Sequence, residues 1–183
     1  MRKVTTLLAA AVLLAWAGWL PAAPVKSGPQ PGERMPGSFR PLHITGPDAG
    51  KRVCLYCKYA ARPVALVFAR ELTPAVADLL ARIDAATAAR RDAGLASFTV
   101  FLGNTDRLTG PVKQLAATRN IRQNILTVDE SAPERYGIAA DAAVTVILYR
   151  RHKVAANHAF RTGELDAGGT AAVLADLDQM LSR

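Results

Sequence analysis

An unbroken apolar run, Val64-Ala65-Leu66-Val67-Phe68, constrains the fold of this chain more than any other stretch. Apolar side chains at every position, several of them β-branched or aromatic, are typical of a strand buried on both faces. A helix signal follows, in which Thr73 is a good N-cap, Pro74 suits the first helical position and Gly94 marks the end. A buried strand followed by a capped helix is the building unit of α/β proteins.

The rest of the chain alternates between strand-like and helix-like patterns. Further strands are predicted at 41–45, 51–59, 98–102, 125–128, 144–149 and 154–160, and helical segments at 111–119, 132–136 and 170–181. This order predicts an α/β domain with a central mixed sheet, helices on both faces and an extra N-terminal β-hairpin. The cysteine-bearing stretch 51–59 is expected to be the return strand of that hairpin and the bend after it.

The N-terminal stretch has the pattern of an export signal. Residues 1–3 carry two positive charges, residues 4–20 are almost wholly apolar, and Ala15-Trp16-Ala17 offers a cleavage site. We therefore predict a signal peptide over 1–23, a Pro/Gly-rich linker over 24–38 and one domain over 39–183. The protein is expected to be exported, periplasmic or secreted, or held at the membrane if the leader is not cleaved.

The formal net charge of +8 does not by itself predict a nucleic-acid-binding protein. Its basic residues are scattered, with one pair at Arg90-Arg91 and a group at Arg150-Arg151-His152-Lys153 in a predicted turn. Nucleic-acid binding requires a basic stripe with interleaved aromatic residues, and the sequence has none. The basic residues are interpreted as solvated surface.

Both cysteines of the chain lie in one C-x-x-C, at Cys54 and Cys57. Four cations flank the pair: Lys51, Arg52, Lys58 and Arg62. Positive charge lowers the pKa of a neighbouring thiol and so favours the thiolate, which is the reactive form. We therefore predict Cys54 and Cys57 as a catalytic redox pair, supported by these cations and shielded by Tyr56. Cys57 is the candidate attacking thiol because Lys58 and Arg62 follow it.

Other roles for the pair stay open at this point. A structural disulfide in so short a loop stabilises by about 2 kcal/mol or less. Zinc requires about four ligands, which only His43, His152 and His158 could complete. A c-type haem is excluded because Lys58 stands where that motif needs histidine. We expect no cofactor and no metal, and a thiol or disulfide protein partner that the sequence does not identify.

Several short motifs resemble the thioredoxin-like superfamily. In the second half, Tyr136-Gly137-Ile138, the strand pattern at 145–149, a basic turn and Val154-Ala155-Ala156 resemble thioredoxin. In the first half, Gly50-Lys51 and the stretch 62–68 resemble the peroxiredoxin and redoxin branch. The resemblance implies a thioredoxin-like fold for 39–183.

The chain departs from that pattern at two positions. In those families the reactive cysteine follows the first central strand, whereas Ala69-Arg70-Glu71-Leu72-Thr73 stands there and contains no sulfur. Thioredoxins also place a cis-proline where Val144 lies, and we expect a trans bond because a cis bond before a non-proline residue costs ~2.5–4 kcal/mol. The resemblance thus implies a thiol–disulfide oxidoreductase with a displaced pair, or a non-catalytic binding module with a structural Cys54–Cys57 disulfide. Peroxidase activity of the usual kind is not expected.

Overall fold

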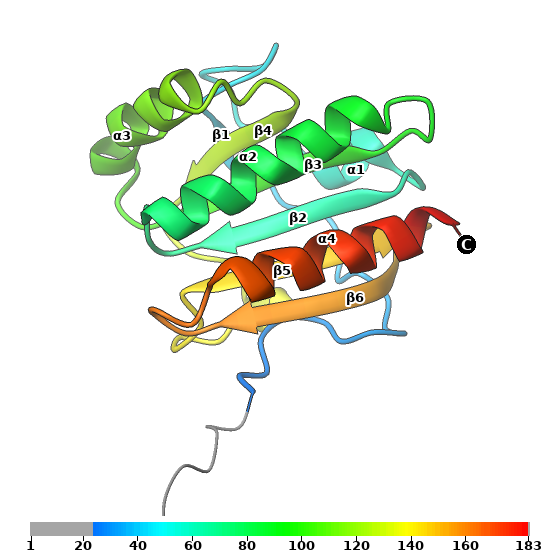
Figure 1. The fold of residues 1–183 in the computed structure, drawn as a ribbon. Coiled ribbons are helices and arrows are strands. Elements are labelled where there is room, and N and C mark those ends of the chain that lie inside the picture. The colour runs from blue at the N-terminus through cyan, green and yellow to red at the C-terminus, as the bar shows by residue number, and fades with distance from the viewer. Residues whose placement is uncertain (1–23, 183) are drawn as a thin grey trace, which may run out of the picture.

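The computed structural model describes residues 24–182, which form a mixed six-stranded sheet with helices packed on it (Figure 1). The elements are β1 (Leu42–His43), α1 (Leu55–Tyr59), β2 (Val64–Ala69), α2 (Pro74–Ala89), β3 (Ala96–Leu102), α3 (Thr105–Thr118), β4 (Asn124–Asp129), the 3₁₀ helix η1 (Glu134–Tyr136), β5 (Val144–Arg150), β6 (Lys153–Phe160) and α4 (Ala167–Ser182). The predicted signal peptide at 1–23 lies outside the described residues.

The strand order is β1-β4-β3-β2-β5-β6. Strands β2, β3 and β4 run parallel, and β1, β5 and β6 pair antiparallel to their neighbours. Parallel neighbours need crossover connections, which α2 and α3 provide. Every residue of β2 is buried, as the apolar run at 64–68 predicts, and β2 lies in the interior of the sheet between β3 and β5. The predicted α/β class and mixed sheet are confirmed.

The long helices cover one face of the sheet. Figure 1 shows α2 and α4 lying across this face, and both contribute to one apolar cluster with α3. Its helical members include Leu79, Leu80 and Ile83 of α2, Val112 of α3, and Val173 and Leu177 of α4. Helix α2 begins as predicted, since Pro74 is its first residue and the Val76 N–H donates to the Thr73 hydroxyl at 3.3 Å.

The other face is covered by shorter elements. Leu55 of α1, Tyr136 of η1 and Met35 of the N-terminal segment pack there against side chains of β2 and β3. The ring of Phe39 lies 5.9 Å from that of Phe68 and 5.1 Å from that of Tyr136, between ring centroids. Helices therefore lie on both faces, but those on this face are only about one turn long.

The segment at 24–38 has the composition of a linker but is fixed to the domain. Its Ser27 hydroxyl lies 2.7 Å from that of Thr145 and accepts the Ala139 N–H. Further along, Arg34 forms a β-bridge with Lys153 at the start of the edge strand β6. Backbone pairing with an edge strand requires no apolar periodicity, so the composition of this segment gave no sign of it.

The extra hairpin is shorter than predicted. Strand β1 pairs mainly with β4, and its return strand is reduced to an isolated bridge between Leu42 and Arg52. Residues 55–59 form α1 instead of the expected strand. Helix α3 also begins earlier than the predicted 111–119, because Asn104 caps it by accepting the Arg107 N–H at 3.0 Å.

Candidate redox site

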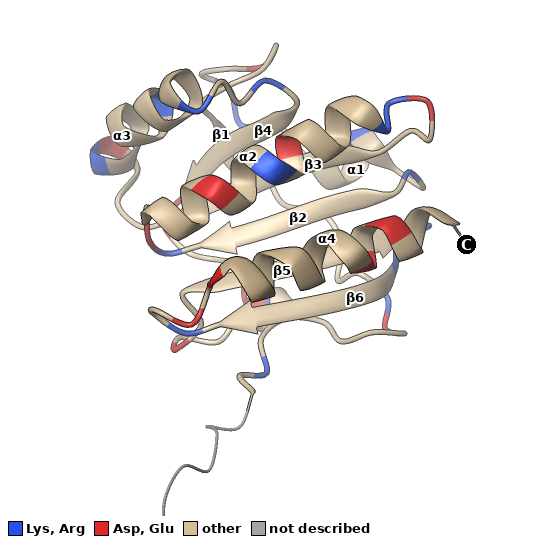
Figure 2. Ribbon diagram, viewed as in Figure 1, with Lys and Arg blue, Asp and Glu red and all other residues tan. Residues whose placement is uncertain are grey.

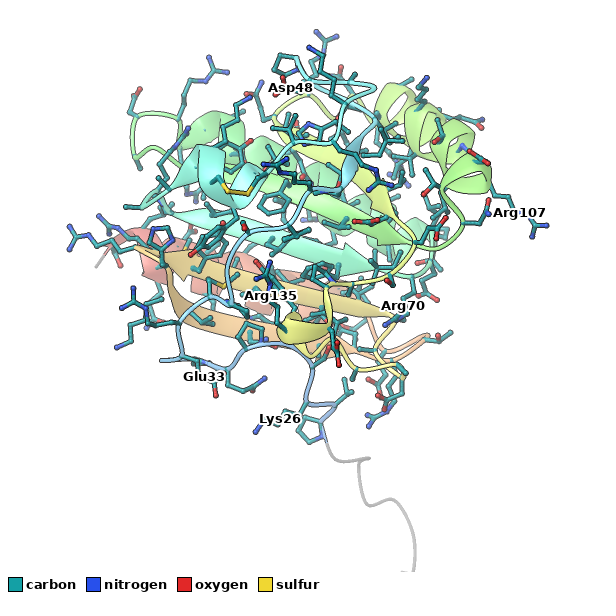
Figure 3. All side chains as sticks on the ribbon, turned by 180° about the vertical axis from the view of Figure 1, so that it is seen from behind. Lys26, Glu33, Asp48, Arg70, Arg107 and Arg135 are labelled. Carbon is teal, nitrogen blue, oxygen red and sulfur yellow. A yellow bond between two sulfur atoms is a disulfide. The ribbon has the colours of Figure 1, made fainter. Side chains whose placement is uncertain are left out.

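The two cysteines lie in the first turn of α1 and form a disulfide, visible as the yellow bond in Figure 3. Cys54 is the N-cap, and its Sγ accepts the N–H of Cys57 at 3.1 Å. This is the geometry in which a serine or threonine cap accepts from the third helical residue. The separation of 5.3 Å between the two Cα atoms follows from the helical turn, which brings residues three apart onto the same side.

The two sulfur-bearing residues differ in their access to solvent. Cys54 is only 8% exposed, whereas Cys57 is an exposed residue. An external thiol therefore reaches Cys57 more readily than Cys54. The buried cysteine is also the one whose sulfur accepts the backbone N–H, so a negative charge on Cys54 would be partly stabilised where it forms.

Helix α1 is held against the sheet by one aliphatic and two aromatic side chains. Leu55 is 1% exposed and is the buried residue of the helix. The ring of Tyr56 lies 6.2 Å from that of Tyr149, and the ring of Tyr59 lies 6.1 Å from that of Phe98. These contacts place the disulfide over the sheet face opposite α2.

All four tyrosines of the chain lie on this side of the sheet. Burial raises the pKa of Tyr59, Tyr136 and Tyr149 above its ordinary value. A phenol is already protonated at neutral pH at its ordinary pKa, and burial opposes ionisation further, so these three side chains place no negative charge beneath the disulfide.

Two of the four predicted cations form ion pairs. Lys58 Nζ lies 2.8 Å from Asp48 Oδ2, and this hydrogen bond lowers the pKa of Asp48. Arg52 Nη1 lies 3.2 Å from Asp129 Oδ1, next to the carboxyl end of β4. Lys51 is exposed at the turn that precedes Arg52.

The fourth cation, Arg62, holds the loop that follows α1. Its Nε donates to the Gly94 carbonyl at 2.7 Å, and its guanidinium carbon lies 5.4 Å from the centre of the Tyr59 ring. Arg52, Lys58 and Arg62 thus fix the surroundings of α1, while the donor that reaches a sulfur is the Cys57 N–H. The sequence points to side-chain charge as the source of thiolate stabilisation, because it does not predict the helical turn that brings the Cys57 N–H to the Cys54 sulfur.

His43 supports the residue just before the disulfide. It is 1% exposed, and its Nε2 lies 3.2 Å from the carbonyl oxygen of Val53. Burial lowers the pKa of His43, so the neutral imidazole donates its Nε2–H to that carbonyl. The sequence pointed to His43 only as a possible zinc ligand, and its positioning role depends on contacts that the sequence does not show.

The other two histidines contact different parts of the structure. The His152 ring lies 5.0 Å from that of Tyr56, whereas His158 Nε2 lies 2.8 Å from Asp176 Oδ2 of α4. Among residues 24–182 there is no group of three or more histidine, cysteine, aspartate or glutamate side chains placed to hold a metal ion.

The position that carries the reactive cysteine in thioredoxins lies at the other end of β2. There Thr73 caps α2 with its hydroxyl, and residues 69–73 contain no sulfur. Among the described residues all peptide bonds are trans, including the one before Val144, as expected. The disulfide lies toward the opposite end, because Tyr149, on which Tyr56 packs, pairs with Val64 at the start of β2.

Comparison with solved structures identifies the fold. The chain is similar to a candidate thiol:disulfide interchange protein, DsbE, from Chlorobium tepidum, with a TM-score of 0.62 and 18% identity over 83% of this chain and 98% of that one. It is similar to a candidate protein disulfide isomerase from Bacteroides thetaiotaomicron, with a TM-score of 0.65 and 16% identity over 87% and 96% of the two chains. A secreted Mycobacterium tuberculosis disulfide oxidoreductase homologous to Escherichia coli DsbE gives a TM-score of 0.57 and 12% identity over 77% and 95%.

These similarities confirm the thioredoxin-like fold that the sequence motifs imply. Because the sequence identities are only 12% to 18%, the similarities establish the fold and not an activity. No protein family matches the sequence, and no curated protein matches it. Within residues 24–182, no helix combines the length and the apolar character needed to cross a membrane.

Proposed function

We propose that this protein is a thiol–disulfide oxidoreductase that acts through Cys54 and Cys57. The observation that carries the proposal is the asymmetry of the disulfide, which joins an exposed sulfur-bearing residue to a buried one whose sulfur accepts a backbone N–H. Disulfide exchange needs one sulfur open to attack and another that leaves as a stabilised thiolate. The thioredoxin-like fold, which the chain shares with disulfide oxidoreductases, agrees with this assignment.

Reduction of the disulfide proceeds in two steps in this mechanism. A partner thiolate attacks Cys57 Sγ, the Cys54–Cys57 bond breaks, and its electron pair goes to Cys54 Sγ. That thiolate keeps the hydrogen bond from the Cys57 N–H and takes up a proton from solvent when it relaxes to the thiol. A second partner thiolate then attacks the partner sulfur of the mixed disulfide and releases Cys57, which leaves a dithiol in the protein and a disulfide in the partner.

The reverse reaction begins with the Cys57 thiolate attacking a partner disulfide. Cys54 then attacks Cys57 Sγ in the mixed disulfide and releases the reduced partner. Which direction dominates is set by the reduction potential of the pair relative to its surroundings.

Measurement of that potential tests the proposal. The full-length protein is equilibrated in glutathione or dithiothreitol redox buffers, and free thiols are counted by alkylation and mass spectrometry. We expect a value between about −270 and −120 mV, the range of working oxidoreductases. A value below about −300 mV would identify a structural disulfide. The protein would then be a non-catalytic thioredoxin-like binding module, which the sulfur-free stretch at 69–73 favours.

We place this activity outside the cytoplasm. The proposal rests on the export pattern at 1–23 and on the similarity to a secreted oxidoreductase. N-terminal sequencing of the protein recovered from separated cell fractions tests it, and a protein that stays in the cytosol with an intact leader would contradict it.

A further inference from the structure

Four cations crowd the turn between β5 and β6. Strand register sets Arg150 opposite Lys153, and a β-bridge sets Arg34 opposite Lys153 as well. Arg151 lies in the turn itself and, like Arg34 and Lys153, is exposed. Like charges placed directly opposite each other across strands destabilise a sheet. We call Arg150, Arg151, Lys153 and Arg34 the basic turn.

No carboxylate within residues 24–182 forms an ion pair with the basic turn. The carboxylate nearest in sequence, Glu33, accepts the Gln30 N–H at 2.8 Å. Elsewhere in the described chain the cations Arg52, Lys58 and Arg90 each pair with an aspartate. The basic turn therefore carries charge that the described residues leave uncompensated.

The backbone of this turn is also costly to form. Arg151 and His152 have φ angles of 51° and 62°, in the left-handed region. A two-residue hairpin turn with positive φ at both positions is normally built from asparagine and glycine, which reach that region with little strain. Arg151 and His152 are not the residues that such a turn normally uses, so this backbone costs more to form than it would with asparagine and glycine.

The basic turn borders both an open hollow and the redox helix. Three of its cations and the apolar side chains of Val154, Ala155 and Met180 line a hollow of about 440 Å³. On the side of α1, the Arg151 N–H donates to the Ala61 carbonyl at 3.1 Å, and the His152 ring packs on Tyr56. The turn thus contacts the chain on either side of Cys57. In Figure 2 other lysines and arginines lie in loops at this end of the sheet, where β2 begins.

We propose that the basic turn docks an acidic segment of the protein whose sulfur exchanges with Cys57. The inference rests on the proposed function and names its partner class. Acidic side chains would neutralise the cations of the basic turn. The apolar residues that line the hollow, Val154, Ala155 and Met180, suit a peptide side chain better than a bare inorganic anion. A segment docked on the turn would lie beside Arg151 and His152, which contact Ala61 and Tyr56 on either side of Cys57.

Three synthetic peptides test the proposal on the full-length oxidised protein. Each has one cysteine between two pairs of flanking residues, which are glutamates, glutamines or lysines. The rate at which each peptide reduces the disulfide is divided by its rate with hydroxyethyl disulfide, a neutral small molecule, to remove differences in thiol pKa. We expect the glutamate peptide to react about tenfold faster than the lysine peptide at low ionic strength, with the preference shrinking at high salt.

Two variants separate the basic turn from the overall charge. The triple variant Arg150→Ser, Arg151→Ser, Lys153→Ser should lose most of the preference. The control Arg107→Ser, Lys113→Ser, Arg119→Ser removes the same charge from exposed positions on and just after α3 and should keep it. Equal rates for the three peptides, or equal loss in both variants, would overturn the proposal.

Two further measurements are needed. One asks whether the turn binds an acidic peptide or any small anion, and the other measures binding without disulfide exchange. Loss of the preference in millimolar phosphate, but not in chloride of equal ionic strength, would overturn it in favour of a small-anion site. Binding of the glutamate peptide with serine in place of cysteine, measured by fluorescence polarisation, should weaken about tenfold in the turn variant only. If no peptide reduces the disulfide, the proposed function fails, and this binding measurement alone decides the docking proposal.

Discussion

Two helices of this protein begin with the same local geometry and serve different purposes. At the start of α1, Cys54 Sγ accepts the N–H of Cys57 at 3.1 Å, and at the start of α2, the Thr73 hydroxyl accepts the N–H of Val76 at 3.3 Å. Helix α1 has five residues and α2 has sixteen. The long helix occupies the position at which thioredoxins carry their reactive cysteine, yet the sulfur lies in the short one.

The difference shows which requirements of disulfide chemistry are local. A sulfur needs a nearby N–H donor and a route to solvent, and both are available in a single helical turn. The long helix contributes packing instead, because Leu79, Leu80 and Ile83 fill the core on its side of the sheet. A thioredoxin-like sheet can therefore hold a cysteine pair on the opposite face without loss of its main structural helix.

The largest effects are expected at the two sulfurs. Either Cys54→Ser or Cys57→Ser should reduce turnover to the uncatalysed background, because both sulfurs take part in the proposed exchange mechanism. With Cys54→Ser, the exposed Cys57 should still form a stable mixed disulfide with a partner. With Cys57→Ser, the buried Cys54 should react at least about tenfold more slowly with iodoacetamide than Cys57 does. Alkylation rates followed by mass spectrometry check both, and a faster Cys54 would reverse the assigned roles.

The next effect concerns how α1 is held in place. Leu55→Ala should lower the free energy of unfolding by about 2–5 kcal/mol, since it removes a fully buried side chain. Leu79→Ala in α2 should fall in the same range, because Leu79 is equally buried. Urea denaturation measures both.

The conservative variant Leu55→Met is the matched control and should cost less than about 1.5 kcal/mol. A cost below about 1 kcal/mol for Leu55→Ala would mean that side-chain packing does not anchor the redox helix, and the parallel with α2 would fail.

A smaller effect is expected at the start of α2. Thr73→Ala should cost about 1 kcal/mol of stability through loss of the cap, while Thr73→Ser should retain most of it. Neither variant should alter the rate of disulfide exchange. If Thr73→Ala slowed exchange while the protein remained folded, the start of α2 would belong to the redox site after all.

The smallest effect is a pH dependence that arises from His43. Its pKa in the folded protein lies below the ordinary value of about 6.5, because burial penalises the charged imidazolium. The unfolded chain therefore takes up this proton first, so the stabilisation is complete above about pH 6.5 and is lost as the pH falls toward the folded pKa. In urea denaturation at pH 7 and pH 5, wild type should lose more stability than His43→Gln. Equal losses would show that His43 is not buried as a neutral ring.

Parts of this molecule could be predicted because their signals are local. The apolar run at 64–68 predicts the buried strand β2, and Thr73 followed by Pro74 predicts the start of α2. A disulfide between Cys54 and Cys57 could also be predicted, because residues three positions apart can be bridged. The helical turn at 54–57 was not predicted, since the flanking β-branched and aromatic residues favour a strand, and packing of Leu55, Tyr56 and Tyr59 on the sheet overrides that preference.

The sequence by itself determined the central strand, its capped helix and the presence of one close cysteine pair. Only the tertiary structure decided which cysteine is covered, which carboxylates and carbonyls engage the flanking cations, and that 24–38 lies against the domain. Secondary-structure propensities and helix caps depend on residues that are close together in the chain, so they can be recognised from the sequence. Burial, ion pairing and edge pairing join residues distant in sequence, so they exist only once the sheet has brought those residues together.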